Sequence, residues 1–103
     1  MSFYSLDNPT DNGAGLPLPL GRSGPVVFVV QGEDFSGGTV TLEVSLNSGD
    51  GAGVWVPLTY NGTPYQTNIN ACYVIDFLAQ GMSLRAYLQG ATAPVDVYAV
   101  FLQ

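Results

Sequence analysis

The sequence contains no lysine, no histidine and few charged residues of any kind. Its 103 residues include two basic side chains, Arg22 and Arg85, against eight Asp and Glu, which gives a formal net charge of −6. Nucleic-acid binding needs a basic surface that neutralises phosphates, and two arginines cannot supply one. An anionic membrane surface is excluded for the same reason. We therefore expect no nucleic-acid partner and no membrane partner.

The lack of histidine and lysine also removes the usual activators of a catalytic serine or cysteine. The carboxylates of Glu43, Asp76 and Asp96 fall on outward strand positions, where solvated side chains are the rule. The segment Asn47–Gly51 has the composition of a calcium loop without its spacing. The sequence therefore predicts a protein that is not an enzyme, with no catalytic residues, no metal site and no cofactor.

Cysteine is nearly absent as well. Cys72 is the single cysteine, so the chain can form no internal disulfide, and its apolar neighbours Tyr73 and Val74 indicate a buried structural thiol. No apolar run approaches the about 18 residues of a membrane span, and the N-terminus lacks the pattern of a secretory signal. We expect neither a membrane span nor a signal peptide.

What the chain has instead is apolar character. Hydrophobic residues make up 47% of it and charged residues 10%, where about 25% charged is typical. Because a monomer usually stays soluble through surface charge, this balance favours a chain that hides surface against partners. The alternative is a surface that is merely polar, rich in Ser, Thr, Asn and Gln. The length suits one domain.

The clearest structural pattern lies between residues 38 and 58. Val40, Leu42 and Val44 alternate with Thr and Glu side chains, as in a strand with one buried face. Residues 47–53 then offer turn chemistry, and Val54–Leu58 resumes as an apolar strand. The segment is predicted to be a β-hairpin with a long polar tip.

Further strands are expected at residues 26–31, 65–68, 72–78, 82–89 and 95–102, with an Asn61-Gly62 hairpin turn before the second of these. The last three are predicted to form a meander with these side chains inward: Tyr73, Ile75, Phe77, Leu84, Ala86, Leu88, Val95, Val97, Ala99 and Phe101. No helical period is present. We predict an all-β domain over residues 26–103, a single antiparallel β-sandwich or jelly roll of seven to eight strands.

Residues 1–25 are predicted to form an extended N-terminal arm, because four prolines and four glycines exclude a helix and a long central strand. The arm is too apolar for a free tail, through Phe3, Tyr4, Leu6, Leu16, Leu18 and Leu20. We favour an arm that lies on a neighbouring subunit. The alternative is an arm folded back to cover its own sheet.

Two expectations concern individual side chains on the strands. If the meander keeps its inward faces in register, Asp76 lies opposite Arg85 and Arg85 opposite Tyr98, which predicts an outer-face clamp of these three. The aromatic residues Trp55, Tyr60, Tyr65, Tyr73, Tyr87 and Tyr98 suit a platform on which sugars stack. Against that, Trp55 is more commonly a core or interface anchor.

Several segments carry a family resemblance. They are Phe35–Leu46, the glycine-rich tip with its return Val54-Trp-Val-Pro-Leu58, and the ending Leu84-Arg85-Ala86, Leu88, Gly90-Ala91-Thr92 and Pro94-Val95-Asp96-Val97. Over residues 26–102 the chain resembles small all-β structural proteins of tailed bacteriophages. The resemblance implies a virion component.

Within that class the resemblance favours a capsid decoration (cement) protein on the capsid exterior, made in the host cytoplasm. It would contact the major capsid protein and copies of itself, as a dimer or trimer. The predicted contact residues are the six apolar arm residues, with Trp55 and residues 48–53 as second choice. The alternatives are a tail, fibre or host-adsorption module, and a carbohydrate-binding β-sandwich.

Overall fold

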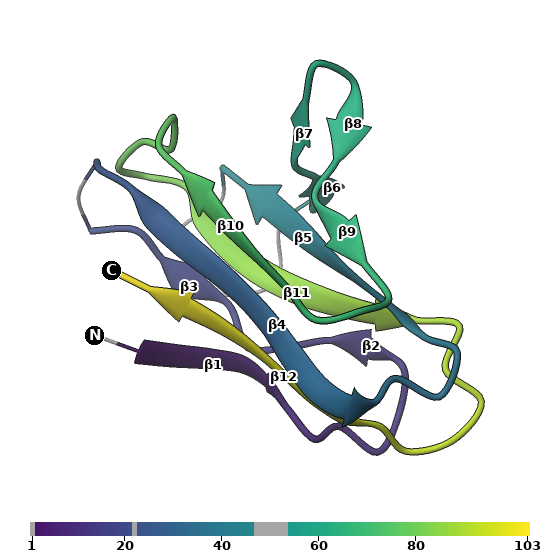
Figure 1. Ribbon diagram of the computed structural model, residues 1–103. Coiled ribbons are helices and arrows are strands. Elements are labelled where there is room, and N and C mark those ends of the chain that lie inside the picture. The colour runs from purple at the N-terminus through teal and green to yellow at the C-terminus, as the bar shows by residue number, and fades with distance from the viewer. Residues whose placement is uncertain (1, 22, 47–53) are drawn as a thin grey trace.

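The computed structural model describes residues 2–21, 23–46 and 54–103, which form strands and no helix (Figure 1). The strands are β1 (Ser2–Asp7), β2 (Gly13–Ala14), β3 (Leu18–Pro19), β4 (Val26–Asp34), β5 (Thr39–Ser45), β6 (Val56–Pro57), β7 (Thr59–Tyr60), β8 (Thr63–Pro64), β9 (Gln66–Thr67), β10 (Ala71–Ile75), β11 (Ser83–Gln89) and β12 (Asp96–Leu102). In this described part, no helix long and apolar enough to cross a membrane occurs. The all-β class predicted from the sequence is confirmed.

The strands form two larger sheets and one small hairpin. The first sheet has the order β1-β12-β4-β10, and the second has the order β2-β11-β5-β6, with β3 also paired to β11 and β9 to β5. β7 and β8 pair with each other, and Figure 1 shows this hairpin standing clear of both larger sheets. All these pairings are antiparallel. The arrangement is compatible with a β-sandwich.

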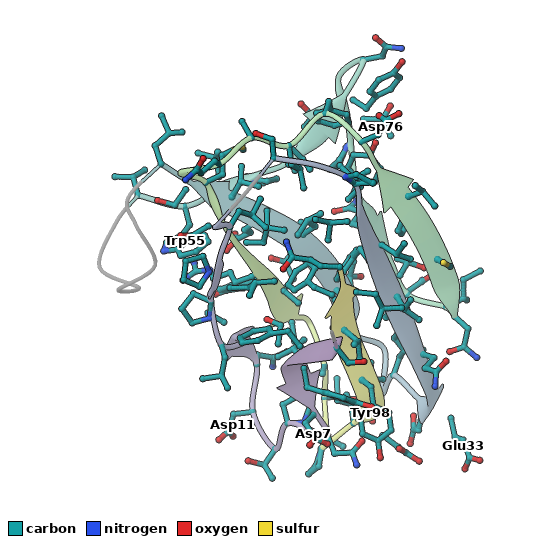
Figure 2. All side chains as sticks on the ribbon, turned by 90° about the vertical axis from the view of Figure 1, so that its left-hand side faces the viewer. Asp7, Asp11, Glu33, Trp55, Asp76 and Tyr98 are labelled. Atoms are coloured by element: carbon teal, nitrogen blue, oxygen red, sulfur yellow. The ribbon has the colours of Figure 1, made fainter. Side chains whose placement is uncertain are left out.

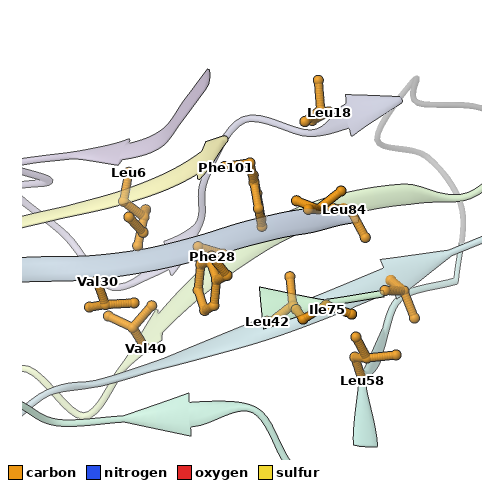
Figure 3. Packing of buried hydrophobic residues seen from close by; sticks show 14 of the residues in the cluster. Leu6, Leu18, Phe28, Val30, Val40, Leu42, Leu58, Ile75, Leu84 and Phe101 are labelled. Atoms are coloured by element: carbon orange, nitrogen blue, oxygen red, sulfur yellow. The ribbon is translucent and has the colours of Figure 1, made fainter. Parts of the chain in front are cut away.

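The core lies between the two larger sheets. Phe28 of β4 and Phe101 of β12 are fully buried and stack with ring centroids 5.1 Å apart. Leu42 of β5 and Leu84 of β11 face them from the second sheet, as the close view in Figure 3 shows. The inward faces predicted for residues 82–89 and 95–102 are confirmed, since alternate side chains on β11 and β12 are buried.

Local patterns predicted several pairings correctly. β4 is a central strand between β12 and β10, as its apolar run indicated. β5 pairs with β6, which confirms the hairpin of residues 38–58, while its predicted tip at residues 47–53 lies outside the described residues. The Asn61-Gly62 turn closes β7 on β8, and both residues have positive φ angles, 52° and 79°. Two positive φ angles are what a type I′ hairpin turn requires.

The predicted meander is wrong. β10 and β12 both pair with β4, whereas β11 pairs with β5 in the other sheet. The chain therefore passes from the first sheet to the second and back over β10, β11 and β12, and these three strands do not pair in sequence. Alternation of apolar and polar residues determines which face of a strand is buried, but the same alternation suits any partner strand.

The N-terminal segment belongs to the sheets. β1 pairs with β12 of the same chain, while β2 and β3 pair with β11, so residues 2–19 contribute strands to both sheets. A register shift in β1 between Tyr4 and Leu6 leaves Ser5 buried. The Ser5 hydroxyl donates to the Leu16 carbonyl (2.8 Å) and accepts from the Ala86 amide (2.9 Å), which ties the first sheet to the second. The boundary predicted at residue 25 does not separate two packing units.

Candidate functional site

The apolar residues of the N-terminal segment divide into buried and exposed groups. Leu6, Leu18 and Leu20 lie in the hydrophobic core, and Phe3 packs partly buried against it. Of the six predicted contact residues, Tyr4 and Leu16 are exposed. The prediction that this segment lies on a neighbouring subunit is therefore wrong for the three buried leucines. Its backbone finds antiparallel partners in β11 and β12, and three of its four leucines lie in the chain's own core.

The predicted clamp of Asp76, Arg85 and Tyr98 is also wrong. Arg85 on β11 lies directly opposite Glu43 on β5, and its Nε donates to the Glu43 carboxylate over 2.7 Å. Figure 2 shows Asp76 and Tyr98 at opposite ends of the molecule. Tyr98 instead makes an edge-to-face contact with Tyr4, with ring centroids 5.9 Å apart. The error follows from the meander, because Tyr98 on β12 and β10, which ends just before Asp76, belong to the sheet that Arg85 is not part of.

Trp55 completes the surroundings of Arg85. The guanidinium carbon of Arg85 lies 4.4 Å from the centroid of the Trp55 ring and 5.7 Å from that of Tyr87. Both ion-pair side chains are largely covered, with 17% of Arg85 and 15% of Glu43 exposed. The Trp55 indole nitrogen is buried and makes no hydrogen bond with the described residues. Trp55 therefore helps to shield the Glu43–Arg85 ion pair from water. The sequence predicted an interface anchor at Trp55 and did not predict this contact.

Arg85→Ala is expected to lower the free energy of unfolding by about 2 kcal/mol. The change removes a cation–π contact of roughly 0.5–2 kcal/mol and leaves the mostly buried Glu43 carboxylate without its cation. Urea denaturation followed by circular dichroism measures the loss. Asp76→Asn is the control, since Asp76 is exposed and its change is expected to stay within about 0.5 kcal/mol. Equal losses in the two variants would contradict this assignment.

An apolar surface lies at one end of the second sheet, which we call the end patch: Leu46, Val54 and Val56. Leu46 and Val54 are 82% and 80% exposed, and Val56 is half exposed. With Val44, Ser45 and Met82 they line a cavity of about 370 Å³. Contiguous exposed apolar side chains around a hollow are typical of a surface that binds another molecule. The sequence pattern placed Val54 and Val56 in a strand but gave no sign that they face outward.

A second surface gathers rings around the β7–β8 hairpin, which we call the aromatic tip: Tyr60, Tyr65, Tyr73 and Phe77. The Phe77 ring lies 5.8 Å from Tyr60 and 6.4 Å from Tyr65, and Tyr65 meets Tyr73 edge to face at 5.4 Å. Tyr60 and Phe77 are exposed. The structure thus joins three of the six predicted platform residues. Trp55, Tyr87 and Tyr98 have their ring contacts elsewhere.

No family model, curated protein or solved structure matches the chain. The assignment of function therefore depends on the two surfaces. Among residues 2–21, 23–46 and 54–103, no cluster of three or more His, Cys, Asp or Glu is arranged to hold a metal ion.

Two side chains on or after β10 differ from their predicted positions. Phe77 was predicted to point inward and is exposed, because β10 ends at Ile75 and the alternation ends with it. Cys72 was predicted to be buried and is exposed on β10, at the edge of the first sheet. Cys72 and Val74 alternate with Tyr73 and Ile75, so they lie on the outer face of the sheet, where side chains contact solvent.

Proposed function

We propose that this chain is a non-enzymatic virion structural protein, and most specifically a capsid decoration protein that bridges subunits of the major capsid protein. The observation that carries the proposal is the end patch, an exposed apolar surface on a chain with few charges. The resemblance to tailed-bacteriophage structural proteins supports the class. A jelly roll of seven to eight strands belongs to this proposal as the finer description of the fold.

The end patch suits attachment to protein because it combines apolar area with a hollow. Burial of such area contributes about 25 cal/mol per Å² removed from water. Binding would desolvate few charges, since the described residues that line the hollow are all uncharged: Val44, Ser45, Leu46, Val54, Val56 and Met82. A side chain from the capsid surface that entered the hollow would exclude water from all of them. The end patch thereby replaces the N-terminal segment as the expected site of attachment.

Repetition would make this attachment strong in spite of its small size. A decoration protein occupies many equivalent positions and contacts copies of itself as a dimer or trimer. Once one contact forms, the next forms at high effective concentration, so that modest single contacts add up. A shell that expands or separates must then break many contacts together, which is how such a protein would stabilise a capsid.

Val54→Asp is expected to leave the fold intact and to weaken attachment by roughly 30-fold, the effect of removing a contact worth about 2 kcal/mol. The charge would have to be desolvated within the end patch, whereas in the free protein Val54 is already in water. The measurement is the number of copies retained on virus particles isolated from cells that make the chain, by quantitative mass spectrometry.

Val74→Asp is the matched control, because it is the same substitution at a valine that is 68% exposed on β10. Its occupancy is expected to equal that of the unchanged chain. Few copies per particle, together with lost adsorption to cells, would instead indicate a tail or fibre module. Absence of the chain from particles would overturn the proposal.

A further inference from the structure

We propose that the aromatic tip is a binding site for a neutral sugar. The site is separate from the end patch, and the inference holds whether or not the end patch binds a capsid. Tyr60, Phe77 and Tyr65 form a row in which neighbouring rings are tilted by 37° and 34°. Rings that are inclined to one another in this way present a shallow, curved surface, and Tyr60 is 58% exposed at its outer end.

The site is held in place by contacts that continue into the core. Tyr73 packs against Phe28 at a centroid distance of 6.2 Å, and Phe28 stacks on Phe101. The Tyr73 hydroxyl donates to the Gln66 carbonyl over 3.2 Å. A chain of rings therefore runs from the centre of the protein to the surface. A site with fixed rings loses little conformational entropy when a ligand binds.

Backbone hydrogen bonds fix the base of the hairpin as well. The Leu58 amide donates to the Leu42 carbonyl over 2.9 Å, and the Tyr65 amide donates to the Leu58 carbonyl over 3.1 Å. The buried Leu58 side chain anchors the same point in the core. The hairpin that carries Tyr60 is consequently joined to β5 of the second sheet and stands out from it in a defined direction (Figure 1).

The chemistry of the hollow fits a sugar. Tyr60, Tyr65 and Tyr73 line a cavity of about 480 Å³, within the roughly 300–1,000 Å³ of small-molecule sites. Its polar lining comes from Asn61, Thr63 and Gln66, which offer amide and hydroxyl groups. The C–H bonds on the apolar face of a pyranose carry partial positive charge and suit the electron-rich face of a tyrosine ring. The hydroxyls at the sugar's edge would meet the amides and the threonine hydroxyl.

The ligand is expected to be uncharged. The described residues that line the cavity are all neutral, so a sialic or uronic acid carboxylate would find no cation among them to replace its water. The net charge of −6 also repels an anion at long range. A proline-rich peptide, which also docks on aromatic surfaces, would leave the amides of Asn61 and Gln66 and the hydroxyl of Thr63 poorly used.

The test is a titration of the isotope-labelled full chain with neutral hexose and N-acetylhexosamine oligosaccharides, followed by amide NMR shifts. Shift changes are expected around residues 59–66, 73 and 77. Tyr60→Ala is expected to weaken binding roughly 3- to 10-fold, and Tyr60→Phe, which keeps the ring, is expected to retain most of it. Tyr4→Ala is the matched control. Tyr4 is also half exposed and also contacts a ring, that of Tyr98, but it lies on β1 and not in the aromatic tip.

Several outcomes would overturn this assignment. They are no shift change with any of these sugars at millimolar concentration, equal weakening by Tyr4→Ala and Tyr60→Ala, or tighter binding of an acidic sugar. Saturation of the same rings by a proline-rich peptide but not by sugars would assign the site to a protein partner instead. None of these results bears on the end patch, which Val54→Asp tests separately, so the two proposals fail independently.

Discussion

A chain that begins at residue 21 is expected to be unfolded. The deletion removes β1 from its place beside β12, and it removes β2 and β3 from β11. It also removes Leu6, Leu18 and Leu20 from the core. A segment that was expected from its sequence to serve assembly is thus required for the fold itself.

The magnitude follows from the three leucines. Truncating a buried leucine to alanine lowers stability by about 2–5 kcal/mol, and a domain of this size has about 5–15 kcal/mol in total. The deletion takes away whole side chains together with the backbone pairing of β12, whose amides and carbonyls on that side would face water. The buried amide of Ala86 would also lose the Ser5 hydroxyl that accepts its hydrogen bond. The combined loss is of the same size as the whole free energy of folding.

Amide NMR dispersion and near-ultraviolet circular dichroism of the shortened chain measure this directly. Both are expected to show an unfolded or molten chain. Leu16→Ala in the full chain is the control, because Leu16 lies in the same segment but is exposed, and its effect is expected to stay within about 0.5 kcal/mol. A well-dispersed spectrum from residues 21–103 would mean that the segment is dispensable, as the sequence-based domain boundary implied.

The sequence concealed the role of this segment for a physical reason. Leu16, Leu18 and Leu20 do alternate, but the residues between them are prolines, which argue against a strand. The register shift after Tyr4 interrupts the alternation of β1. Short strands that pair at the edges of sheets tolerate prolines and bulges. What the composition did show correctly was that such an apolar segment must be covered by something. It could not show that the cover is the chain's own core.

The Glu43–Arg85 pair marks a second limit of prediction from sequence. Alternation correctly placed both side chains on outer faces, and the structure puts them on one face of the second sheet. Their pairing depends on which strands are neighbours in the sheet, and β5 and β11 are far apart in the sequence, with residues 46–82 between them. Predicting partners from sequence order gave Asp76 and Tyr98 instead. The same limit applies to the aromatic tip, because Tyr60 and Phe77 meet through the folding of a hairpin onto the end of β10.

Phe28→Ala is expected to destabilise the protein by about 3–5 kcal/mol, the largest effect of any single substitution considered. Phe28 is fully buried on β4, and its ring contacts both Phe101 and Tyr73. Alanine would leave a cavity that two sheets, each held by its own hydrogen bonds, cannot close. Urea denaturation followed by circular dichroism measures the change. If the slope of the unfolding free energy against urea concentration is unchanged, the substitution has altered stability alone.

Phe77→Ala is the matched control and separates burial from ring contact. Phe77 also touches two rings, Tyr60 and Tyr65, but it is exposed, so its loss is expected to be about 1 kcal/mol or less. A loss near that of Phe28→Ala would mean that the aromatic tip is part of the folding core. A small loss of stability, together with a change in sugar binding, is expected instead. In the series of contacting rings from Phe101 to Tyr60, the outer rings contact solvent, whereas the inner rings pack in the core between the two sheets.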